Sequence, residues 1–343
     1  MSPSLRFPEF NGEWEKCKIE DITDAVSSGK SKNHFSNGEY NLYGSTGIIG
    51  RTDKALYDGK LVLVARVGAN AGFLQIINEP CGITDNTLIL KPKGIDAFYL
   101  YYFLQHFNLN RLIFGSGQPL ITGGMLKKVK VSLGTISEQS KIVKFLSLLD
   151  ERIATQVRLI DRLQSLMIGI AQKIAHSNKP NVRISDCLEC SSSALQESEV
   201  NKTGKYPVYG ANGIVGYIDK YHTQNEAIYI IKDGSGVGGV SYVTGKCSST
   251  GTLNILQAKN GHSLKYLYYL LKVFNFVPYK TGMAIPHIYF KDYGKAKIFC
   301  PAYPEQLEYA KLLSSIDGNL RIALDSLKNF NLQKQYLLRH MLI

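Results

Sequence analysis

The side chains that could hold a metal ion or act as nucleophiles are scattered through this sequence of 343 residues. Of its six cysteines, only Cys187 and Cys190 form a CxxC pair, and no second ligand pair stands at the spacing of a zinc site. The seven histidines show no metal-ligand spacing either. We therefore expect no metal site, and we interpret the cysteines as reduced thiols of a cytoplasmic protein.

A second candidate is the glycine run at residues 234–239, which satisfies the GxGxxG pattern of dinucleotide-binding loops. Such a loop binds phosphate at the N-terminus of a helix, whereas the residues that follow, VSYVTGKCSS, are typical of a strand. The equivalent segment of the first half, residues 68–72, lacks the pattern. The run is therefore predicted to be a glycine hairpin, and a nucleotide-dependent enzyme that uses it stays open as an alternative.

No other catalytic pattern is present. The sequence contains no P-loop GxxxxGK[ST], no HExxH and no GxSxG, and it lacks the Pro-Pro pair found in the NPPY motif of adenine methyltransferases. We expect no catalytic residue and no cofactor, so the protein is predicted not to be an enzyme.

The composition favours a polyanionic partner. Forty Lys and Arg against 28 Asp and Glu give a net charge of +12, which suits nucleic acid or an anionic membrane surface. The sequence shows no apolar signal segment and no run of about 18 apolar residues that could span a bilayer. We therefore expect a cytoplasmic protein that does not enter a membrane.

The elements that must position any binding residue come in two copies. YNLYGSTGIIGRTDK, from Tyr40, matches YPVYGANGIVGYIDK, from Tyr206, and the offset of 166 residues also places LVLVARVGANAG on AIYIIKDGSGVG. Glu138-Gln139 matches a second Glu-Gln pair at an offset of 167. A repeat of this length indicates two copies of one domain. The Tyr-Gly pair of each copy, followed by a further glycine, is interpreted as a shared tight turn with positive φ.

Each copy is predicted to be a mixed α+β globule. Short β-branched runs at 61–66 and 227–231 predict buried strands. Longer aromatic runs at 99–107 and 265–274, each after an Asp or Ser that can cap it, predict a packed helix.

Each copy ends in a long predicted helix. Apolar residues recur along both helices in a heptad pattern, broken by Gln156 in the first and by Lys334 in the second. The apolar positions are Leu146, Leu149, Ile153, Ile160, Leu163, Met167, Ile170 and Ile174, then Leu313, Ile316, Leu320, Ala323, Leu327, Phe330, Leu337 and Met341. Such a stripe needs a partner, so we predict that the helices pair as an antiparallel coiled coil. Two alternatives stay open: each stripe packs on its own globule, and the polar breaks either fix the register or are local defects.

Several of these features together resemble one known family. The opening RFPEFNGEWEKCKIEDI, the YGSTGIIG and YGANGIVG segments and the Glu-Gln pair at the head of each long helix are similar to type I restriction-modification specificity subunits, over essentially the whole chain. The resemblance implies two target recognition domains and two spacer helices. We expect recognition domains at residues 1–136 and 179–303, and spacer helices at 137–178 and 304–343.

The resemblance also implies a function. Such a chain reads a bipartite asymmetric target in double-stranded DNA, while methyltransferase and restriction subunits supply the chemistry. Because the two copies present two similar docking surfaces along the helices, we expect two methyltransferase subunits per chain. A coiled-coil scaffold whose globules bind other proteins is the remaining alternative, and salt-dependent retention on duplex DNA separates the two.

Residues that read bases should lie where the two copies diverge, on polar or basic loops. Arg, Lys, Asn and Gln offer the donors and acceptors that distinguish bases in the major groove, and Lys also binds phosphate. The candidates are Lys30, Lys32, Asn33, His34, Arg66, Asn70, Gln118 and Lys128 in the first copy, and Lys202, Lys205, Lys232, Ser235, Lys280 and His287 in the second. For each of them a solvated surface role is the alternative, and Arg66, which ends a predicted strand, is also a candidate for the edge of the core.

Overall fold

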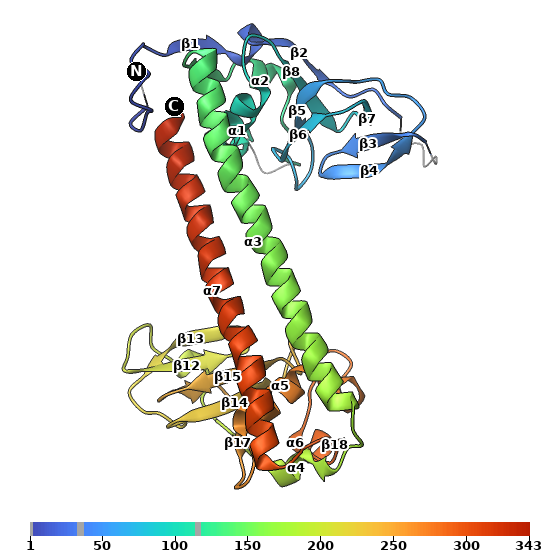
Figure 1. The fold of residues 1–343 in the computed structure, drawn as a ribbon, viewed down its shortest axis with the longest axis vertical. Coiled ribbons are helices and arrows are strands. Elements are labelled where there is room, and N and C mark those ends of the chain that lie inside the picture. The colour runs from blue at the N-terminus through green and yellow to red at the C-terminus, as the bar shows by residue number, and fades with distance from the viewer. Residues whose placement is uncertain (1–2, 33–37, 114–117) are drawn as a thin grey trace. The chain divides into compact units, whose positions relative to one another are not determined.

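The computed structural model describes residues 3–32, 38–113 and 118–343, and the chain divides into two compact units (Figure 1). Unit 1 comprises residues 1–157 and 325–343, and unit 2 comprises residues 158–324. Each unit therefore holds the globular part of one sequence repeat together with portions of both long helices.

Unit 1 contains three small sheets. Its strands are β1 (Glu15–Lys18), β2 (Thr23–Ser28), β3 (Tyr40–Gly44), β4 (Gly47–Thr52), β5 (Lys60–Ala65), β6 (Leu74–Asn78), β7 (Cys81–Ile83), β8 (Thr87–Pro92) and β9 (Lys130–Leu133). They pair in the orders β2-β8-β5-β6, β4-β3-β7 and β1-β9. The four-stranded sheet is antiparallel throughout, whereas β3 and β7 are parallel. The β-branched run predicted as a buried strand is the central strand β5, whose residues 61–65 are all buried.

The helices of unit 1 are α1 (Ala97–Phe107), the short α2 (Gly123–Lys127) and the first part of α3 (Ile136–His176). Asp96 caps α1, because its carboxylate accepts hydrogen bonds from the backbone N–H groups of Phe98 and Tyr99. Helix α1 packs against β5 and β6, and its buried aromatic residues join the main core of the unit. The predicted aromatic helix and its Asp cap are thus confirmed.

Unit 2 repeats this plan. Its strands are β10 (Val182–Arg183), β11 (Leu188–Ser192), β12 (Tyr206–Gly210), β13 (Gly213–Ile218), β14 (Glu226–Ile231), β15 (Val240–Thr244), β16 (Ser248–Ser249), β17 (Leu253–Ala258) and β18 (Lys297–Ile298). They pair in the orders β11-β17-β14-β15, β13-β12-β16 and β10-β18, strand for strand as in unit 1. Its helices are α4 (Ile184–Cys187), α5 (Leu264–Val273), α6 (Phe290–Tyr293) and the first part of α7 (Tyr303–Met341). The prediction of two α+β copies is confirmed.

Two glycines explain why the Tyr-Gly segments recur in both copies. Gly47 and Gly213 begin the second strand of equivalent hairpins, with φ of 128° and 104°. L side chains rarely adopt these angles, so both positions favour glycine. The repeated motif is therefore a scaffold turn, as predicted.

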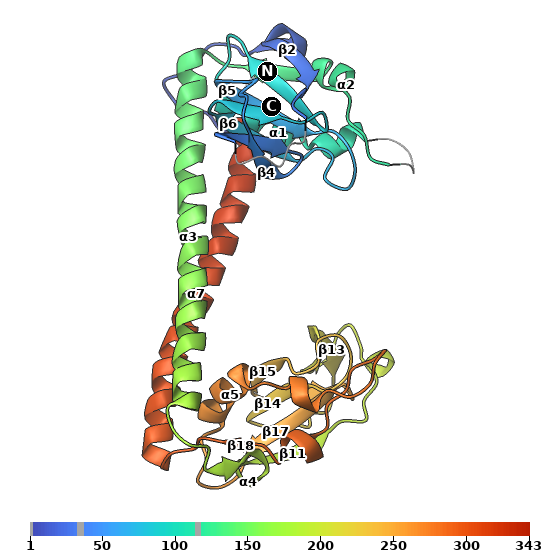
Figure 2. The same cartoon turned by 90° about the vertical axis from the view of Figure 1, so that its right-hand side faces the viewer.

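In unit 1 the two long helices run antiparallel (Figure 2) and share a core. Ile142 and Leu146 of α3 belong to the same buried cluster as Leu338 and Met341 of α7. The cluster also includes α1, through Tyr102 among others. The apolar stripe of α3 therefore packs on the other long helix and on its own globule at once, so the two alternatives for the stripe are not exclusive.

The portions of these helices in unit 2 follow the same plan. Met167 and Ala171 of α3 and Leu320 of α7 are buried and line one pocket together with Tyr269 of α5. In the described part of the chain, the helices include none that is long and apolar enough to cross a bilayer.

Lys334, a polar break in the stripe, has partners on both neighbouring helices. Its ammonium group lies 2.6 Å from a carboxylate oxygen of Asp150 and 5.5 Å from the centre of the Tyr102 ring. The Tyr102 hydroxyl donates a hydrogen bond of 2.8 Å to the same carboxylate. These contacts join α7 to α3 and α1 at one level of the helix pair, and the role of Lys334 in fixing the register stays a prediction.

Candidate nucleic-acid interface

In unit 1 two segments far apart in sequence form one surface. The hairpin between β5 and β6 lies against the chain that follows α1, because Gly68 N–H donates to the Pro119 carbonyl at 3.0 Å. Ile121 N–H donates in turn to the Arg66 carbonyl at 2.8 Å. We call these two segments, residues 66–73 and 118–122, the loop pair of unit 1.

Unit 2 builds the same arrangement at equivalent positions. Gly234 N–H donates to the Pro286 carbonyl at 3.0 Å, and Ile288 N–H donates to the Lys232 carbonyl at 2.9 Å. The glycine run that matches GxGxxG is the β14–β15 hairpin, as predicted, and a strand follows it. We call residues 232–239 and 281–288 the loop pair of unit 2.

The loop pair of unit 1 brings three of the predicted base readers together. Arg66 directly follows β5, and its buried Nε has no hydrogen-bond partner in the described part of the chain. Asn70 is exposed in the hairpin turn. Gln118 is exposed on the other segment. Its side-chain amide lies beside Gly68, because a Cβ atom at Gly68 would stand 4.0 Å from the Gln118 amide nitrogen. The surface therefore presents two exposed amides beside the half-buried Arg66 side chain, and amides offer donors and acceptors suited to base edges.

The loop pair of unit 2 presents different chemistry. His287 Nδ1 lies 2.6 Å from a carboxylate oxygen of Asp233, and both side chains are about one third exposed. Ser235 is exposed in the hairpin, and Lys280 precedes the second segment. A neutral imidazole that donates through Nδ1 to Asp233 keeps Nε2 as an acceptor.

Lys232 stands at the position equivalent to Arg66 and is half-buried. Burial raises the pKa of the nearby Cys190 thiol to about 11, against the opposing effect of the Lys232 charge. Lys232 N–H donates to the Thr252 carbonyl at 3.0 Å, which fixes the backbone of this residue beside β17. The two units thus place a cation at the same point of the frame, a guanidinium in one and an ammonium in the other.

The other predicted base readers are not part of the loop pairs. Lys30 and Lys32 line a separate pocket with Asp53 and Lys54. Exposed positions after α2 and before β12 hold the next three, Lys128, Lys202 and Lys205. The last two predicted readers, Asn33 and His34, lie outside the described residues.

Sequence reasoning missed three residues of the unit 2 loop pair. Asp233 was not predicted, although it holds His287. Met283 is fully exposed and Ile285 is 59% exposed, both in the second segment. Apolar side chains left in water beside polar ones are suited to contact the methyl group of thymine. One sequence signal could have indicated these exposed apolar residues: Met and Ile stand in a glycine-containing segment that shows neither strand nor helix periodicity.

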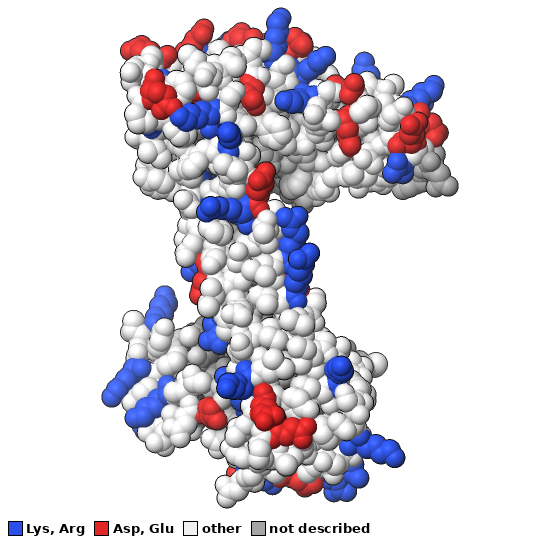
Figure 3. All heavy atoms as spheres, in the orientation of Figure 1, with Lys and Arg blue, Asp and Glu red and all other residues white. Residues whose placement is uncertain are grey.

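Charge alone does not mark the interface. Figure 3 shows Lys and Arg side chains over the visible face of both units, with Asp and Glu between them. The net charge of +12 favours approach to a polyanion, whereas the loop pairs carry the groups that could discriminate bases.

One family model matches this chain twice. The type I restriction modification DNA specificity domain matches residues 11–165 and again residues 177–329. The chain belongs to this family. The two matches confirm both the internal repeat and the predicted resemblance. The family is that of the specificity subunits, which recognise DNA targets and are not the catalytic subunits of type I systems.

Known specificity subunits resemble this one in sequence. A putative type I specificity subunit of Mycoplasma genitalium is 26% identical over 269 residues, which cover 71% of this chain and 70% of the relative. The specificity subunit of the type I restriction enzyme EcoprrI of Escherichia coli is 26% identical over 127 residues, 37% of this chain and 31% of that one.

Solved structures share the fold of this specificity subunit. The crystal structure of the S subunit of a type I restriction-modification system from M. genitalium aligns with a TM-score of 0.74 at 20% identity, covering 100% of this chain and 99% of that chain. A chain from a structure described as the basis of complex assembly and conformational transition of the type I system aligns with a TM-score of 0.56 at 13% identity. That alignment covers 96% of this chain and 97% of the other.

Proposed function

We propose that each unit reads one part of a bipartite asymmetric target in double-stranded DNA through its loop pair. The observation that carries this proposal is that the two loop pairs share backbone hydrogen bonds but differ in side chains. Arg66 is replaced by Lys232 at the equivalent position, and Leu120 by His287. An identical frame with different donors and acceptors suits two half-sites of different sequence.

The Nε atom of Arg66, which has no hydrogen-bond partner among the described residues, supports a role at the DNA surface. A buried donor without an acceptor costs about 1–3 kcal/mol, and more when the group is charged. A phosphate oxygen or the O6 and N7 acceptors of guanine would supply the missing acceptor. His287, held by Asp233, is pre-oriented and loses little side-chain freedom on binding.

The expected protein partners are two methyltransferase subunits and, beside them, restriction subunits. Apolar side chains are exposed at equivalent points of the two long helices, 167 residues apart. Phe145 of α3 corresponds to Leu312 of α7, and Val157 corresponds to Leu324, all 40% to 48% exposed. Two similar surfaces suit two copies of one partner.

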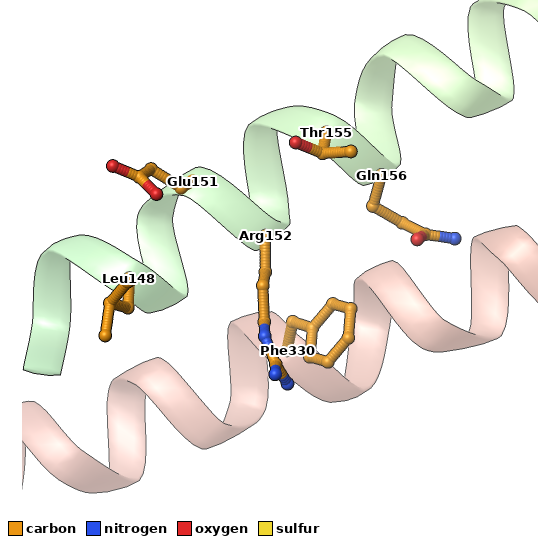
Figure 4. Close-up of a pocket in the computed structure, with 6 residues that line it drawn as sticks. All are labelled: Leu148, Glu151, Arg152, Thr155, Gln156 and Phe330. Atoms are coloured by element: carbon orange, nitrogen blue, oxygen red, sulfur yellow. The ribbon is translucent and has the colours of Figure 1, made fainter.

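A pocket in unit 1 lies beside this surface. Arg152 reaches from α3 toward α7 and lies next to the Phe330 ring, while Leu148 and Glu151 complete one side of the pocket (Figure 4). Leu148 is half exposed. An exposed apolar side chain beside an arginine and an aromatic ring is typical of the centre of protein interfaces.

The predicted domain boundaries belong to the same proposal. Residues 1–136 and 179–303 would be the target recognition domains, and 137–178 and 304–343 the spacers. Helix α3 has 41 residues and α7 has 39, so each is about 60 Å long at about 1.5 Å per residue.

A double substitution in the unit 2 loop pair tests this function. D233V/H287L installs the equivalent residues of unit 1, Val67 and Leu120, without removing backbone bonds. We expect that host DNA methylated by the variant with its methyltransferase partner shows a changed or relaxed half-site for unit 2 and an unchanged other half-site. K220Q, which removes an exposed lysine of the same unit, is the matched control and should keep the original target. An unaltered target in the folded double variant would contradict the proposal.

The chain alone should transfer no methyl group. It should nevertheless bind duplex DNA with an affinity that falls steeply with salt, because phosphate contacts release counterions. Methyl transfer by the purified chain without a partner, or DNA retention that ignores salt, would favour the enzyme or the protein scaffold instead.

A further inference from the structure

Unit 2 gathers two cysteines and a histidine that are far apart in sequence. Cys187 ends α4, His262 precedes the cap of α5, and Cys300 follows β18. One ligand atom from each of these residues lies within 4.8 Å of the other two. Both cysteines are buried.

One ring nitrogen of the histidine in this cluster is left without a partner. His262 Nδ1 is buried and makes no hydrogen bond in the described part of the chain. Removing an imidazole nitrogen from water is unfavourable unless a donor, an acceptor or a metal ion takes the place of water. A metal ion bound with the two sulfurs would satisfy it.

Unit 1 shows that the fold does not need polar residues here. The residues equivalent to this cluster are Ile22, Ile95 and Leu133, which all belong to or pack against the core of unit 1. The backbone is the same at both places, because Lys93 N–H donates to the Ile22 carbonyl at 2.8 Å and Lys259 N–H donates to that of Cys187 at 2.9 Å. An apolar contact in one copy is thus replaced by three metal-ligating side chains in the other.

The backbone around the cluster is held in place independently of the cluster. The side-chain amide of Asn181 donates to the Cys300 carbonyl at 2.7 Å and accepts from Cys300 N–H at 2.8 Å. His262 N–H donates to the Lys259 carbonyl at 3.1 Å. The three ligands are therefore presented by anchored segments, as a preformed metal site requires.

We propose that Cys187, His262 and Cys300 bind one divalent metal ion of the zinc class. Two thiolates and one imidazole are a ligand set typical of tetrahedral Zn²⁺, with a water molecule at the fourth position. His262 is partly exposed, so solvent reaches the cluster. The ion links α4, the approach to α5 and the segment that leads into α7, and it stabilises this end of unit 2.

The expectation of no metal site considered only sequence spacing. The CxxC pattern drew attention to Cys190, which is not part of the cluster and whose Sγ lies 3.7 Å from the Ser191 carbonyl oxygen. The ligand partners of Cys187 lie 75 and 113 residues further along the chain, far beyond the short ligand spacings of zinc-finger motifs.

Metal content of the full chain tests the proposal. The chain is purified in reductant, loaded with Zn²⁺ and desalted, and we expect about one zinc per chain by elemental analysis. Loading with Co²⁺ should give thiolate-to-cobalt charge-transfer absorption, and a chelator should lower the melting temperature. C187I/H262I/C300L installs the residues that unit 1 has at these positions. This variant should retain no metal, and the chelator should not change its melting temperature. C190S is the control and should bind as the natural chain does.

H262I keeps the test decisive if the triple variant does not fold, because it leaves both thiols in place. We expect at least a tenfold loss of zinc affinity for this variant. Three results would overturn the proposal: a natural chain that retains no zinc, a triple variant that retains as much as the natural chain, or a Cys187–Cys300 disulfide in the reduced preparation.

Discussion

The two units of this specificity subunit share one backbone arrangement but place different side chains around it. The Glu-Gln pair at the head of each long helix shows this difference. Gln139 accepts a hydrogen bond from Asp96 N–H and donates to the Gly134 carbonyl. Gln306 makes the same two bonds, to Ser263 N–H and the Pro301 carbonyl, and both glutamines are 2% exposed. The glutamine thus joins the helix of the globule to the long helix in either unit.

The glutamate beside it has opposite surroundings in the two units. Glu138 is fully buried and accepts bonds from the Arg6 guanidinium at 2.6 and 2.8 Å and from the Trp14 indole at 3.1 Å. Glu305 is exposed and accepts only from Tyr309 among the described residues. A repeated sequence motif therefore predicts a shared backbone, whereas the role of each side chain depends on what the rest of the unit places next to it.

Exchanging a whole recognition domain should have the largest effect. Replacing residues 1–136 by those of a relative should change one half-site completely and leave the other intact, because each unit has its own core and its own loop pair. The measurement is the set of methylated motifs in a host that carries the chimera and its methyltransferase. Simultaneous change of both half-sites would show that the two units do not read independently.

The glutamate pair should show the next largest difference. Glu138→Ala leaves the Arg6 side chain and the buried Trp14 indole N–H without their shared carboxylate, so we expect a larger loss in the free energy of unfolding than at the exposed Glu305. Glu305→Ala is the matched control in unit 2 and should change the free energy of unfolding by about 0.5 kcal/mol or less. Urea denaturation of both variants measures this, and equal losses would mean that burial does not distinguish the two positions.

A smaller effect is expected at the polar break of the stripe. Lys334→Met installs the side chain of Met167, the equivalent residue in unit 2, and removes the ion pair with Asp150. Asp150 keeps the Tyr102 hydroxyl and is 35% exposed, so we expect a change of about 1 kcal/mol or less. Lys328→Met, at an exposed position of α7, controls for the loss of charge. A loss of more than about 3 kcal/mol in the free energy of unfolding, measured by urea denaturation, would show that the ion pair contributes strongly to stability.

Much of the fold could be predicted from sequence because its signals are local. The caps Asp96 and Ser263, the β-branched runs of β5 and β14, and the heptad stripes each lie within one short segment. The repeat then applies each of these signals twice, which is why the α+β plan and the long helices were predicted correctly.

The sites were less predictable because they depend on contacts between distant segments. No pattern indicates that Pro119 pairs with the hairpin at Gly68, or that His287 meets Asp233. Candidate readers were therefore chosen for being polar in divergent loops, and the loop pairs contain only some of them. The cluster that contains Cys187 and His262 could not be predicted for the same reason, since only the folded chain brings these residues together.

The spacing of the two half-sites tests most directly whether two separate readers are held at a set distance by the long helices. Inserting seven residues after Ile160 and seven after Leu327 keeps both stripes in phase and lengthens each helix by about 10 Å. At about 3.4 Å per base pair, we expect the methylated motif of the active variant to contain about three more base pairs between its half-sites. An active variant that still methylates the original spacing would contradict the proposal that these helices set the distance.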